Sequence, residues 1–495
     1  MKQMIQRLTI LLSFIVLAGI TSCSDLLKED PKNQVFRDNY FENDNDAISA
    51  VNAIYAHLNS TSLGPTFGGV YHSTYWVIQG LASDEMNNRA AGAPQDDQLS
   101  TFSYNAENPT IFDLWVQTYR AISNANFALG GIPDSPIDES LKTRLVGEAS
   151  FLRALLYYEL VRVYGEVPLI LEDDDELRPN KNTVDEIYNQ IIVDLTLAAG
   201  SLPESYSAGN GLGRATWGAA KTLLAHVNLT RGNYADAALH AQDVISSNNY
   251  MLWPDFQDAF SISNENGMES VFNIGFGDAN GAISFWEVGQ FNVRLLPQEL
   301  ANDIPGINAQ GWQVATEDLY DSFDPLDRRR AITFITSTSM GPLNDPHIRK
   351  YWDEVNEPSG GNTENDFPYF RYSEVLLILA EALNEQNNGP TAEAYDAINE
   401  VRARARFDGT TEQPVLPDLS GLSYDEFRDA VLLERRKEFV AEGKRWFDLV
   451  RMNKLQELVP IAKPGVSPQA FHNLFPIPLE EIDLNQNLLP QNTGY

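Results

Sequence analysis

The sequence has 495 residues and a formal net charge of −34, from 35 Lys and Arg against 69 Asp and Glu. A surface this acidic repels phosphate backbones and anionic lipid headgroups, so we expect no nucleic-acid partner. Hydrophobic residues make up 43% of the chain and Cys occurs once, so a large core without disulfides is expected.

The first 22 residues have the pattern of an export signal. Two basic residues precede the apolar run 8–20, which at 13 residues is shorter than a membrane-spanning helix. The residues before Cys23, ending in the small Ser22, resemble a degenerate bacterial lipobox. We therefore expect cleavage before Cys23 and a lipid on its sulfur, which would anchor the protein to a membrane. The alternative is an ordinary signal peptide with an incidental cysteine.

The expected organisation follows from composition. After a signal peptide at 1–22, residues 23–45 are polar and acidic and are interpreted as a lipidated tether. No long low-complexity linker divides the remainder, which we separate into an N-terminal half, 46–250, and a C-terminal half, 251–495.

Helical periodicity dominates both halves. Apolar residues recur at close to 3.6-residue spacing in 111–129, 145–164 and 184–199, which predicts three amphipathic helices. The segments 214–248 and 371–405 each predict a helix, a tight turn and a second helix. The fold class is therefore expected to be mostly α.

The two helix–turn–helix segments match one another in helical phase. Gly232-Asn233 marks the turn of the first and Asn387-Asn388-Gly389 that of the second, and small residues such as Ala225 lie where helices must approach closely. Units of about 34 residues with this pattern are typical of tetratricopeptide-like repeats. Such repeats stack into a curved scaffold with a concave face.

Two regions lack this periodicity. Residues 249–370 are rich in Gly, Asn, Pro and Ser with scattered aromatics, and 59–108 has a similar character. We expect irregular loops with short strands there. Loops of this length in a compact protein are usually functional.

Four sequence blocks resemble one family. They are GEASFLRALLYYELVRVYGEVPLI (147–170), RYSEVLLILAEALNE (371–385), ERRKEFVAEGKRWFDLVR (434–451) and FPIPLEEIDLNQNLLPQNTGY (475–495). In this order they closely resemble the SusD/RagB family of surface glycan-binding lipoproteins of the Bacteroidetes. The resemblance implies a mostly α-helical SusD-like fold with a tetratricopeptide-like scaffold.

The resemblance also implies partners and a location. It implies a SusC-like TonB-dependent outer-membrane transporter, which a family member covers like a lid. It places the protein at the outer membrane, anchored through Cys23 and facing the cell exterior. A structural calcium ion is compatible with the family, but no loop has the EF-hand pattern and the acidic run 173–176 is better interpreted as solvated. No cofactor is otherwise expected.

The family blocks themselves are interpreted as structural. In 434–451 an apolar stripe alternates with charged residues, and these charges are expected to pack one helix against the scaffold rather than to catalyse a reaction. The sequence contains no H-E-x-x-H or G-x-S-x-G motif. We therefore expect a binding protein and not an enzyme.

A glycan site requires aromatic faces for the C–H-rich sides of sugar rings and polar groups for the hydroxyls. Three tryptophans in loop-rich regions meet the first requirement: Trp76, Trp286 and Trp312. We expect at least two of them to form an exposed platform. The polar and aromatic partners predicted around them are Tyr71, Asp84, Asn88, Arg89, Asn292 and Gln313.

The expected function is to bind oligosaccharide or polysaccharide at the cell surface and deliver it to the transporter. One alternative is a RagB-like protein that captures peptides. Another is a surface scaffold subunit that binds no nutrient.

Overall fold

The computed structural model describes residues 1–2, 40–59, 69–172, 177–206, 211–277, 289–356, 364–407 and 409–495. Cys23 and Trp286, with the predictions that concern them, lie outside these residues. Within them the protein is mostly helical, as expected. No helix of the described part is long and apolar enough to span a membrane.

The helices with their bounds are α2 Asp44–Asn59, α3 Thr74–Leu81, α4 Pro94–Thr101, α5 Pro109–Gly131, α6 Glu139–Tyr164, α7 Val184–Ser201, α8 Trp217–Arg231, α9 Tyr234–Ser246, α10 Phe291–Leu295, α11 Glu317–Asp321, α12 Arg328–Thr333, α13 Tyr372–Asn387, α14 Ala392–Arg406, α15 Tyr424–Glu438, α16 Arg445–Arg451, α17 Leu455–Ala462 and α18 Leu479–Leu484. The strands are β1 Met86–Asn88, β2 Ser270–Ile274, β3 Gln313–Ala315, β4 Phe334–Thr338, β5 Gly341–Ile348 and β6 Phe367–Arg371.

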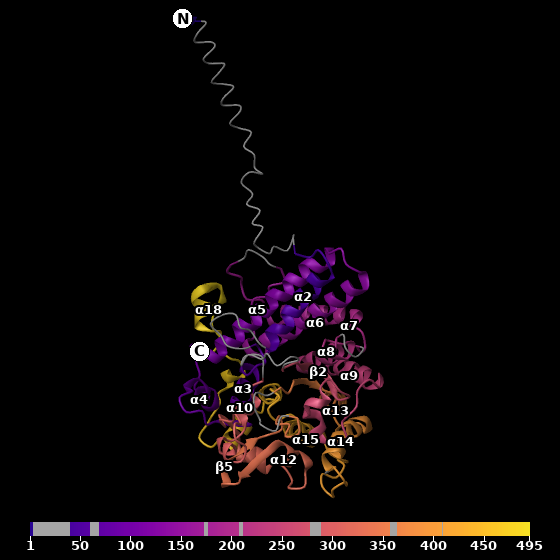
Figure 1. Ribbon diagram of the computed structural model, residues 1–495, viewed down its shortest axis with the longest axis vertical. Helices are drawn as coiled ribbons and strands as arrows, with labels where there is room; N and C mark the ends of the chain where they lie inside the picture. The colour runs from indigo at the N-terminus through magenta and orange to yellow at the C-terminus, as the bar shows by residue number, and fades with distance from the viewer. Residues whose placement is uncertain are drawn as a thin grey trace.

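The long helices pack in a continuous series. α2 lies against α5, α5 against α6, and the series continues through α7, α8 and α9 to α13, α14 and α15. In Figure 1 this series runs down one side of the molecule, from α2 and α6 to α13 and α14. All five helical segments expected from periodicity are present, and the loop-rich elements α4, α10 and β5 lie beside them.

The turn between α8 and α9 shows why this helix–turn–helix segment could be predicted from the sequence. Thr216 caps the start of α8 by accepting the amide of Ala219, and Gly232 ends it with a φ of 75°, a left-handed conformation that favours glycine. Ala225 and Ala241 are fully buried. Small side chains here let α8, α9 and α13 approach closely, so the predicted role of these alanines is confirmed.

The strands form three two-stranded antiparallel sheets among the described residues. β1 pairs with β3, β2 with β6, and β4 with β5 as a hairpin. β1 precedes β3 in the chain by more than 200 residues, so this small sheet joins the two loop-rich regions. The expected short strands are confirmed.

One expectation about 434–451 is wrong. The block is two helices rather than one, because α15 ends at Glu438 and α16 begins at Arg445. Between them Ala441 and Gly443 have φ values of 60° and 66°, which no continuing α-helix can include. The chain therefore turns sharply beneath Tyr75.

The structural interpretation of the charges in this block is confirmed. Glu438 is fully buried and contacts Arg371 at 2.8 Å and Arg329 at 3.2 Å, and it also pairs with Arg404. These arginines come from β6, α12 and α14. A buried charge needs such partners because its desolvation is costly. The network therefore joins the C-terminal helices to the loop-rich region.

The two predicted halves share one hydrophobic core. A single cluster of buried side chains extends from Phe41 through the repeat helices to Leu488. The division at residue 250 remains a prediction about organisation along the chain, because packing is continuous across it.

Candidate functional site

The β1–β3 sheet brings the two clusters of predicted polar residues together. Asn88 lies opposite Gln313, and the next residue outward, Arg89, donates its amide to the carbonyl of Trp312 at 2.6 Å. Residues near position 88 and residues near position 312 are thus neighbours across a two-stranded ladder. Sequence spacing alone does not reveal this pairing.

An open polar hollow lies beside this ladder, and we call it the Arg89 hollow. It has a volume of about 200 Å³. Its lining residues carry guanidinium, carboxylate, amide and imidazole groups: Arg89, Gln298, Glu299, Gln310, Gly311, Leu343, Asn344, Asp345 and His347. This mixture suits a ligand with several hydroxyl or amide groups.

A forked ion pair lies in the wall of the Arg89 hollow. Arg89 donates from Nε to Asp345 at 2.9 Å and from Nη2 at 2.8 Å. The Arg89 side chain is 48% exposed and that of Asp345 is 22% exposed. Both groups keep donor and acceptor positions accessible to solvent, because each uses only part of its hydrogen-bonding capacity in the pair.

His347 contributes a neutral ring to the same wall. Burial lowers its pKa, and its Nδ1 lies 3.1 Å from the carbonyl oxygen of Leu295. The imidazole is therefore uncharged at neutral pH, with Nδ1–H donating to that carbonyl. Gly311 has a φ of 59° and passes so close to His347 that a Cβ would lie 2.7 Å from the ring.

Trp312 follows Gly311 and is partly exposed. The guanidinium of Arg294 lies 5.0 Å from its ring centroid, within the range of a cation–π interaction. Arg294 is in turn 3.6 Å from the carboxylate of Asp96. These contacts hold the indole beside Arg294 of α10, and Trp312 is not among the residues that line the Arg89 hollow, although its neighbour Gly311 is.

A second opening lies near β2, and we call it the Asn273 groove. It has a volume of about 490 Å³. Amide and aromatic side chains predominate among its polar lining residues, which are Asn52, Tyr55, Asn59, Arg214, Glu265, Asn266, Asn273 and Asp366. Neither Trp312 nor Arg89 lines this groove.

Comparison with known proteins identifies the family. A family model described as "SusD family" matches residues 329–495, and one described as "Starch-binding associating with outer membrane" matches 39–229. SusD-like protein P2 of Formosa agariphila is 32% identical, over 98% of this chain and 99% of its own length. The chain belongs to the SusD/RagB family.

This SusD family member is also similar to one further curated relative and to solved structures. Starch-binding protein SusD of Bacteroides thetaiotaomicron is 25% identical, over 80% of this chain and 81% of its own. A solved structure described as a laminarin binding SusD-like protein is 26% identical with a TM-score of 0.74, covering 92% of this chain and 100% of that one. The SusD-like fold expected from the sequence is therefore confirmed.

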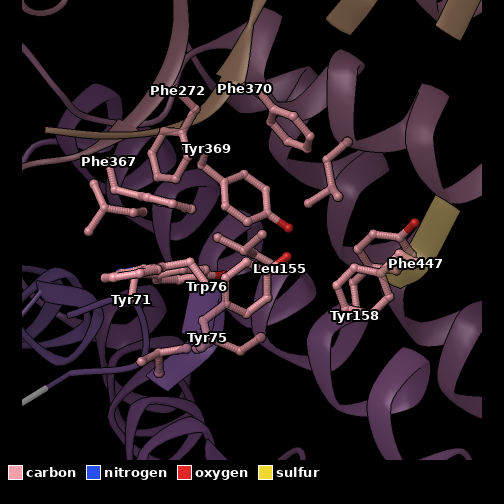
Figure 2. Close-up of a cluster of buried hydrophobic side chains, with 14 of the residues drawn as sticks. Tyr71, Tyr75, Trp76, Leu155, Tyr158, Phe272, Phe367, Tyr369, Phe370 and Phe447 are labelled. Carbon is pink, nitrogen blue, oxygen red and sulfur yellow. The ribbon is translucent and has the colours of Figure 1, made fainter. Parts of the chain in front are cut away.

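In this SusD family member Trp76 is not an exposed platform residue, so that prediction is wrong. Its side chain is fully buried and its ring centroid lies 5.2 Å from that of Phe291. Tyr71 is also fully buried and donates its hydroxyl to Glu159 at 3.1 Å. Figure 2 shows both residues in the aromatic cluster with Tyr75 and Phe367. Helix α3 is buried along its whole length, because it packs beneath α16 and β1.

The prediction that Asp84 contacts a glycan is also wrong. Asp84 is 1% exposed and forms an ion pair with Arg445 at 2.7 Å and another with Arg436 at 3.3 Å. Burial acts to raise its pKa, but the charges of these two arginines outweigh burial and lower the pKa to about 2. Asp84 is thus ionised at neutral pH and anchors the segment that leads into β1.

The structure places the three amide side chains that were predicted to contact a glycan in different surroundings. Gln313 is fully buried and donates to Asp96 at 3.1 Å, and Asn292 is buried within α10. Both are corrected to structural residues, because neither presents a surface to a ligand. Asn88 is 8% exposed and donates to Asp97 at 2.8 Å, so it positions the turn that carries Arg89.

Among the predicted residues that the structure describes, Arg89 lines the hollow, and the partly exposed Trp312 adjoins Arg89 through a backbone hydrogen bond. That Arg89, Trp312 and Trp286 bind a glycan remains a prediction. The sequence reasoning missed Asp345 and His347, which come from β5. The run Asn344-Asp345-Pro346 has turn composition, but only tertiary structure places it against Arg89, 256 residues earlier.

No group of three or more His, Cys, Asp or Glu side chains in the described part is arranged to hold a metal ion. The polar lining of the Arg89 hollow includes Glu299, which is exposed, and Asp345, which pairs with Arg89. The lining of the hollow therefore offers charged and amide hydrogen-bonding groups to a ligand.

Proposed function

We propose that this SusD family member is a non-catalytic lipoprotein that binds oligosaccharide or polysaccharide at the cell surface. It passes the glycan to a SusC-like TonB-dependent transporter of the outer membrane. The names of the starch-binding and laminarin-binding relatives support the ligand class. The family model's description supports association with the outer membrane.

The observation that carries the proposal is the exposed Arg89–Asp345 fork beside Trp312. Sugar hydroxyls need groups that both donate and accept, and the hollow supplies a guanidinium, a carboxylate and the amides of Gln298 and Gln310. The partly exposed indole supplies an apolar face for a pyranose ring. The two hydrogen bonds of the fork hold both side chains in one geometry, which lowers the ordering cost of binding.

Anchoring follows from the N-terminus. A lipid on Cys23 would hold the acidic domain at the membrane, with residues 23–45 as the tether. Two or more acyl chains are needed for stable attachment. A Cys23→Ala variant is expected to be absent from the membrane fraction, whereas the wild-type protein, which keeps Cys23, is expected to be found there.

The ligand is tested by isothermal titration calorimetry with laminarihexaose and maltohexaose. Arg89→Ala is expected to weaken glycan binding at least tenfold with an unchanged circular dichroism spectrum. The matched control is Arg231→Ala, which also removes an exposed arginine from an ion pair, with Asp185 at 2.9 Å, on a distant helix. Its glycan affinity is expected to equal that of the wild type.

Other outcomes distinguish the alternatives. Peptide binding without any glycan binding would replace the proposal by peptide capture. Binding of neither class, with retained co-purification of a transporter, would favour the scaffold role. Equal affinity of wild type and Arg89→Ala for a glycan would retain the ligand class and remove the Arg89 hollow as its site.

A further inference from the structure

The Asn273 groove continues into a second hollow, which has a volume of about 360 Å³. The two share five lining residues: Leu212, Gly213, Arg214, Asn266 and Asn273. Because they have this wall in common, they form one elongated groove, which we call the Arg214 groove. The Arg89 hollow has no lining residue in common with it, so the two openings are separate.

The Arg214 groove runs along β2. Residues of β2 line both of its ends, residues of α2 line one end, and Tyr206, Asn249 and Tyr250 line the other. Both α2 and α8 pack against β2, and Figure 1 shows β2 beside α8 near the centre of the molecule. A paired strand and long helices of the scaffold therefore position this groove.

Arg214 lies where the two hollows join, and its side chain is held there. Its Nη1 donates to Glu148 at 2.7 Å, and its Nη2 donates to the side chain of Asn52. The Glu148 side chain is fully buried and that of Arg214 is 20% exposed. A guanidinium has five N–H donors, so these two bonds leave others for a ligand. Arg214 thus presents donors to the groove while Glu148 compensates its charge.

Two tyrosine rings in the groove are fixed by hydrogen bonds of their hydroxyls. Tyr206 donates to the carbonyl of Ala215 at 3.0 Å, and the Tyr250 hydroxyl lies 3.0 Å from that of Thr216. Both rings are half-buried and line the groove. Since Ala215 and Thr216 directly follow Arg214, one short segment orients the two rings and the guanidinium together.

Glycines support both rings from behind. A Cβ at Gly211 would lie 2.6 Å from the ring of Tyr206, and a Cβ at Gly218 would collide with the Tyr250 hydroxyl. The backbone therefore approaches each ring more closely than any other residue would permit. The rings are held in place before a ligand binds, which lowers the ordering cost of binding.

Asparagine side chains complete the polar surface of the groove. Asn249 donates its Nδ2 to Glu204 at 3.2 Å, and Asn266 donates its Nδ2 to Asp366 at 3.4 Å. Neither bond uses the Oδ1 atom, so each amide keeps an acceptor for a ligand. Glu204 and Asp366 also line the groove, and their carboxylates disfavour an anionic ligand.

We propose that the Arg214 groove is a second site, for a neutral oligosaccharide. The rings of Tyr206 and Tyr250 supply apolar faces for sugar rings. Arg214 donates to hydroxyl groups, and the amide oxygens accept from them. A tyrosine ring has less apolar area than the indole of Trp312, so the affinity here is weaker than at the Arg89 hollow.

The second site changes how a long polysaccharide is held. Two sites on one chain raise the effective concentration of a polymer that carries many copies of the same sugar, so retention exceeds that of either site alone. The ligand class follows from the side chains of the Arg214 groove itself, whereas this role in retention rests on the proposed function.

The first test isolates the groove in the mature full-length Arg89→Ala protein. Isothermal titration calorimetry with laminarihexaose and maltohexaose is expected to show a residual, weaker binding step with one site per chain. Adding Tyr206→Ala is expected to weaken that step at least tenfold. The matched control adds Tyr395→Ala instead, which also removes a half-buried tyrosine that donates to a main-chain carbonyl, that of Leu422 at 3.4 Å, and leaves the step unchanged.

A second pair of variants tests the groove without touching a packed ring. Asn249→Ala truncates an exposed side chain and is expected to weaken the residual step several-fold at an unchanged Tm. Asn387→Ala is its control, because Asn387 is also exposed and its Nδ2 donates to the carbonyl of Leu383 at 2.7 Å. A residual step that both Tyr206→Ala and Asn249→Ala leave intact would overturn the assignment.

Further outcomes separate this proposal from the proposed function. If the wild type binds a hexasaccharide and Arg89→Ala binds none at millimolar ligand, the second site is refuted and the Arg89 hollow stands. If Tyr206→Ala abolishes binding that Arg89→Ala leaves unchanged, the Arg214 groove stands and the Arg89 hollow is removed. If the wild type binds neither hexasaccharide, both proposals fail.

The role in retention is measured by affinity electrophoresis in native gels that contain laminarin. Arg89→Ala and Tyr206→Ala are each expected to reduce retardation, and the double variant is expected to migrate as it does in a gel without polysaccharide. Retardation of Tyr206→Ala equal to that of the wild type would contradict a contribution of the second site.

Discussion

The guanidinium of Arg445 donates two hydrogen bonds to the carboxylate of Asp84, from Nε at 2.7 Å and from Nη2 at 2.8 Å, across 361 residues of sequence. Both side chains are almost completely buried. The pair connects α16 to the segment that enters β1. It therefore fixes the strand from which Arg89 reaches the candidate site.

Removing the acid of this pair is expected to destabilise the fold. Asp84→Asn leaves Arg445 buried without its compensating charge, which costs about 3–5 kcal/mol. Asp345→Asn is the matched control, because it breaks an arginine pair at the surface and should cost less than about 1 kcal/mol. Urea unfolding followed by circular dichroism measures both. Equal midpoints for the two variants would contradict the anchoring role.

Because the pKa of Asp84 is lowered, we expect the folded protein to lose stability at acidic pH. Burial acts to raise the pKa of Asp84 and of Asp448, but neighbouring arginines outweigh it and lower both to about 2, from 3.8. A lowered folded-state pKa gives stability that is present above pH 3.8 and is lost as pH falls toward 2. Each group contributes about 2 kcal/mol by this linkage. Tm measured from pH 5 to pH 2 is expected to fall steeply below pH 4.

For Glu85 we expect the opposite pH dependence of folding stability. Burial and the charge of Asp84 raise its pKa to about 8, from 4.5. A raised folded-state pKa gives stability that is complete below pH 4.5 and is lost as pH rises through 8. Glu85→Gln keeps the shape without an ionisable proton, so its Tm should exceed that of the wild type at pH 8–9.

Burial lowers the pKa of Lys463 to about 7, while the charges of Asp84 and Glu85 act to raise it, so the two proteins are compared at each pH. Between pH 4 and 5, where Glu85 is protonated in the folded wild type, the two proteins should unfold at similar temperatures. A variant that is less stable than the wild type at pH 9 would show that the carboxylate is ionised and paired.

Trp76 and Trp312 should respond differently to substitution. Trp76→Phe removes part of a buried ring and leaves a cavity, so it should lower the free energy of unfolding by about 1–3 kcal/mol with glycan affinity unchanged. Trp312→Ala should weaken binding several-fold with little change in Tm. Calorimetry and thermal unfolding on the same samples separate the two. Unchanged affinity in Trp312→Ala would remove it from the proposed site.

Gly443 tests the turn between α15 and α16. It has a φ of 66°, and a Cβ there would lie 2.5 Å from the buried ring of Tyr75. Gly443→Ala therefore adds a steric clash to the left-handed strain, for a total of about 2–5 kcal/mol. Gly421 has the same φ with open space around it, so Gly421→Ala should cost only about 1 kcal/mol. Similar Tm values for the two variants would contradict the close contact.

The sequence by itself determined the helical scaffold. Apolar periodicity places α5 to α9 and α13 to α14 within a few residues of their bounds, because helix formation depends on neighbours three or four positions away. Turn residues such as Gly232 and Asn388 are equally local signals, since both adopt left-handed backbone conformations. The family blocks could be recognised because each is contiguous, but the partners of Glu438, which are Arg329, Arg371 and Arg404, come from distant segments.

Only the tertiary structure decided which polar and aromatic side chains reach the surface. Trp76 and Trp312 both lie in loop-rich sequence, yet Trp76 packs on Phe291 in the core whereas Trp312 is partly exposed. Burial depends on chain segments hundreds of residues apart, and Asp345 meets Arg89 only because β5 folds back toward the β1–β3 ladder. Spacing along a sequence carries no record of such contacts.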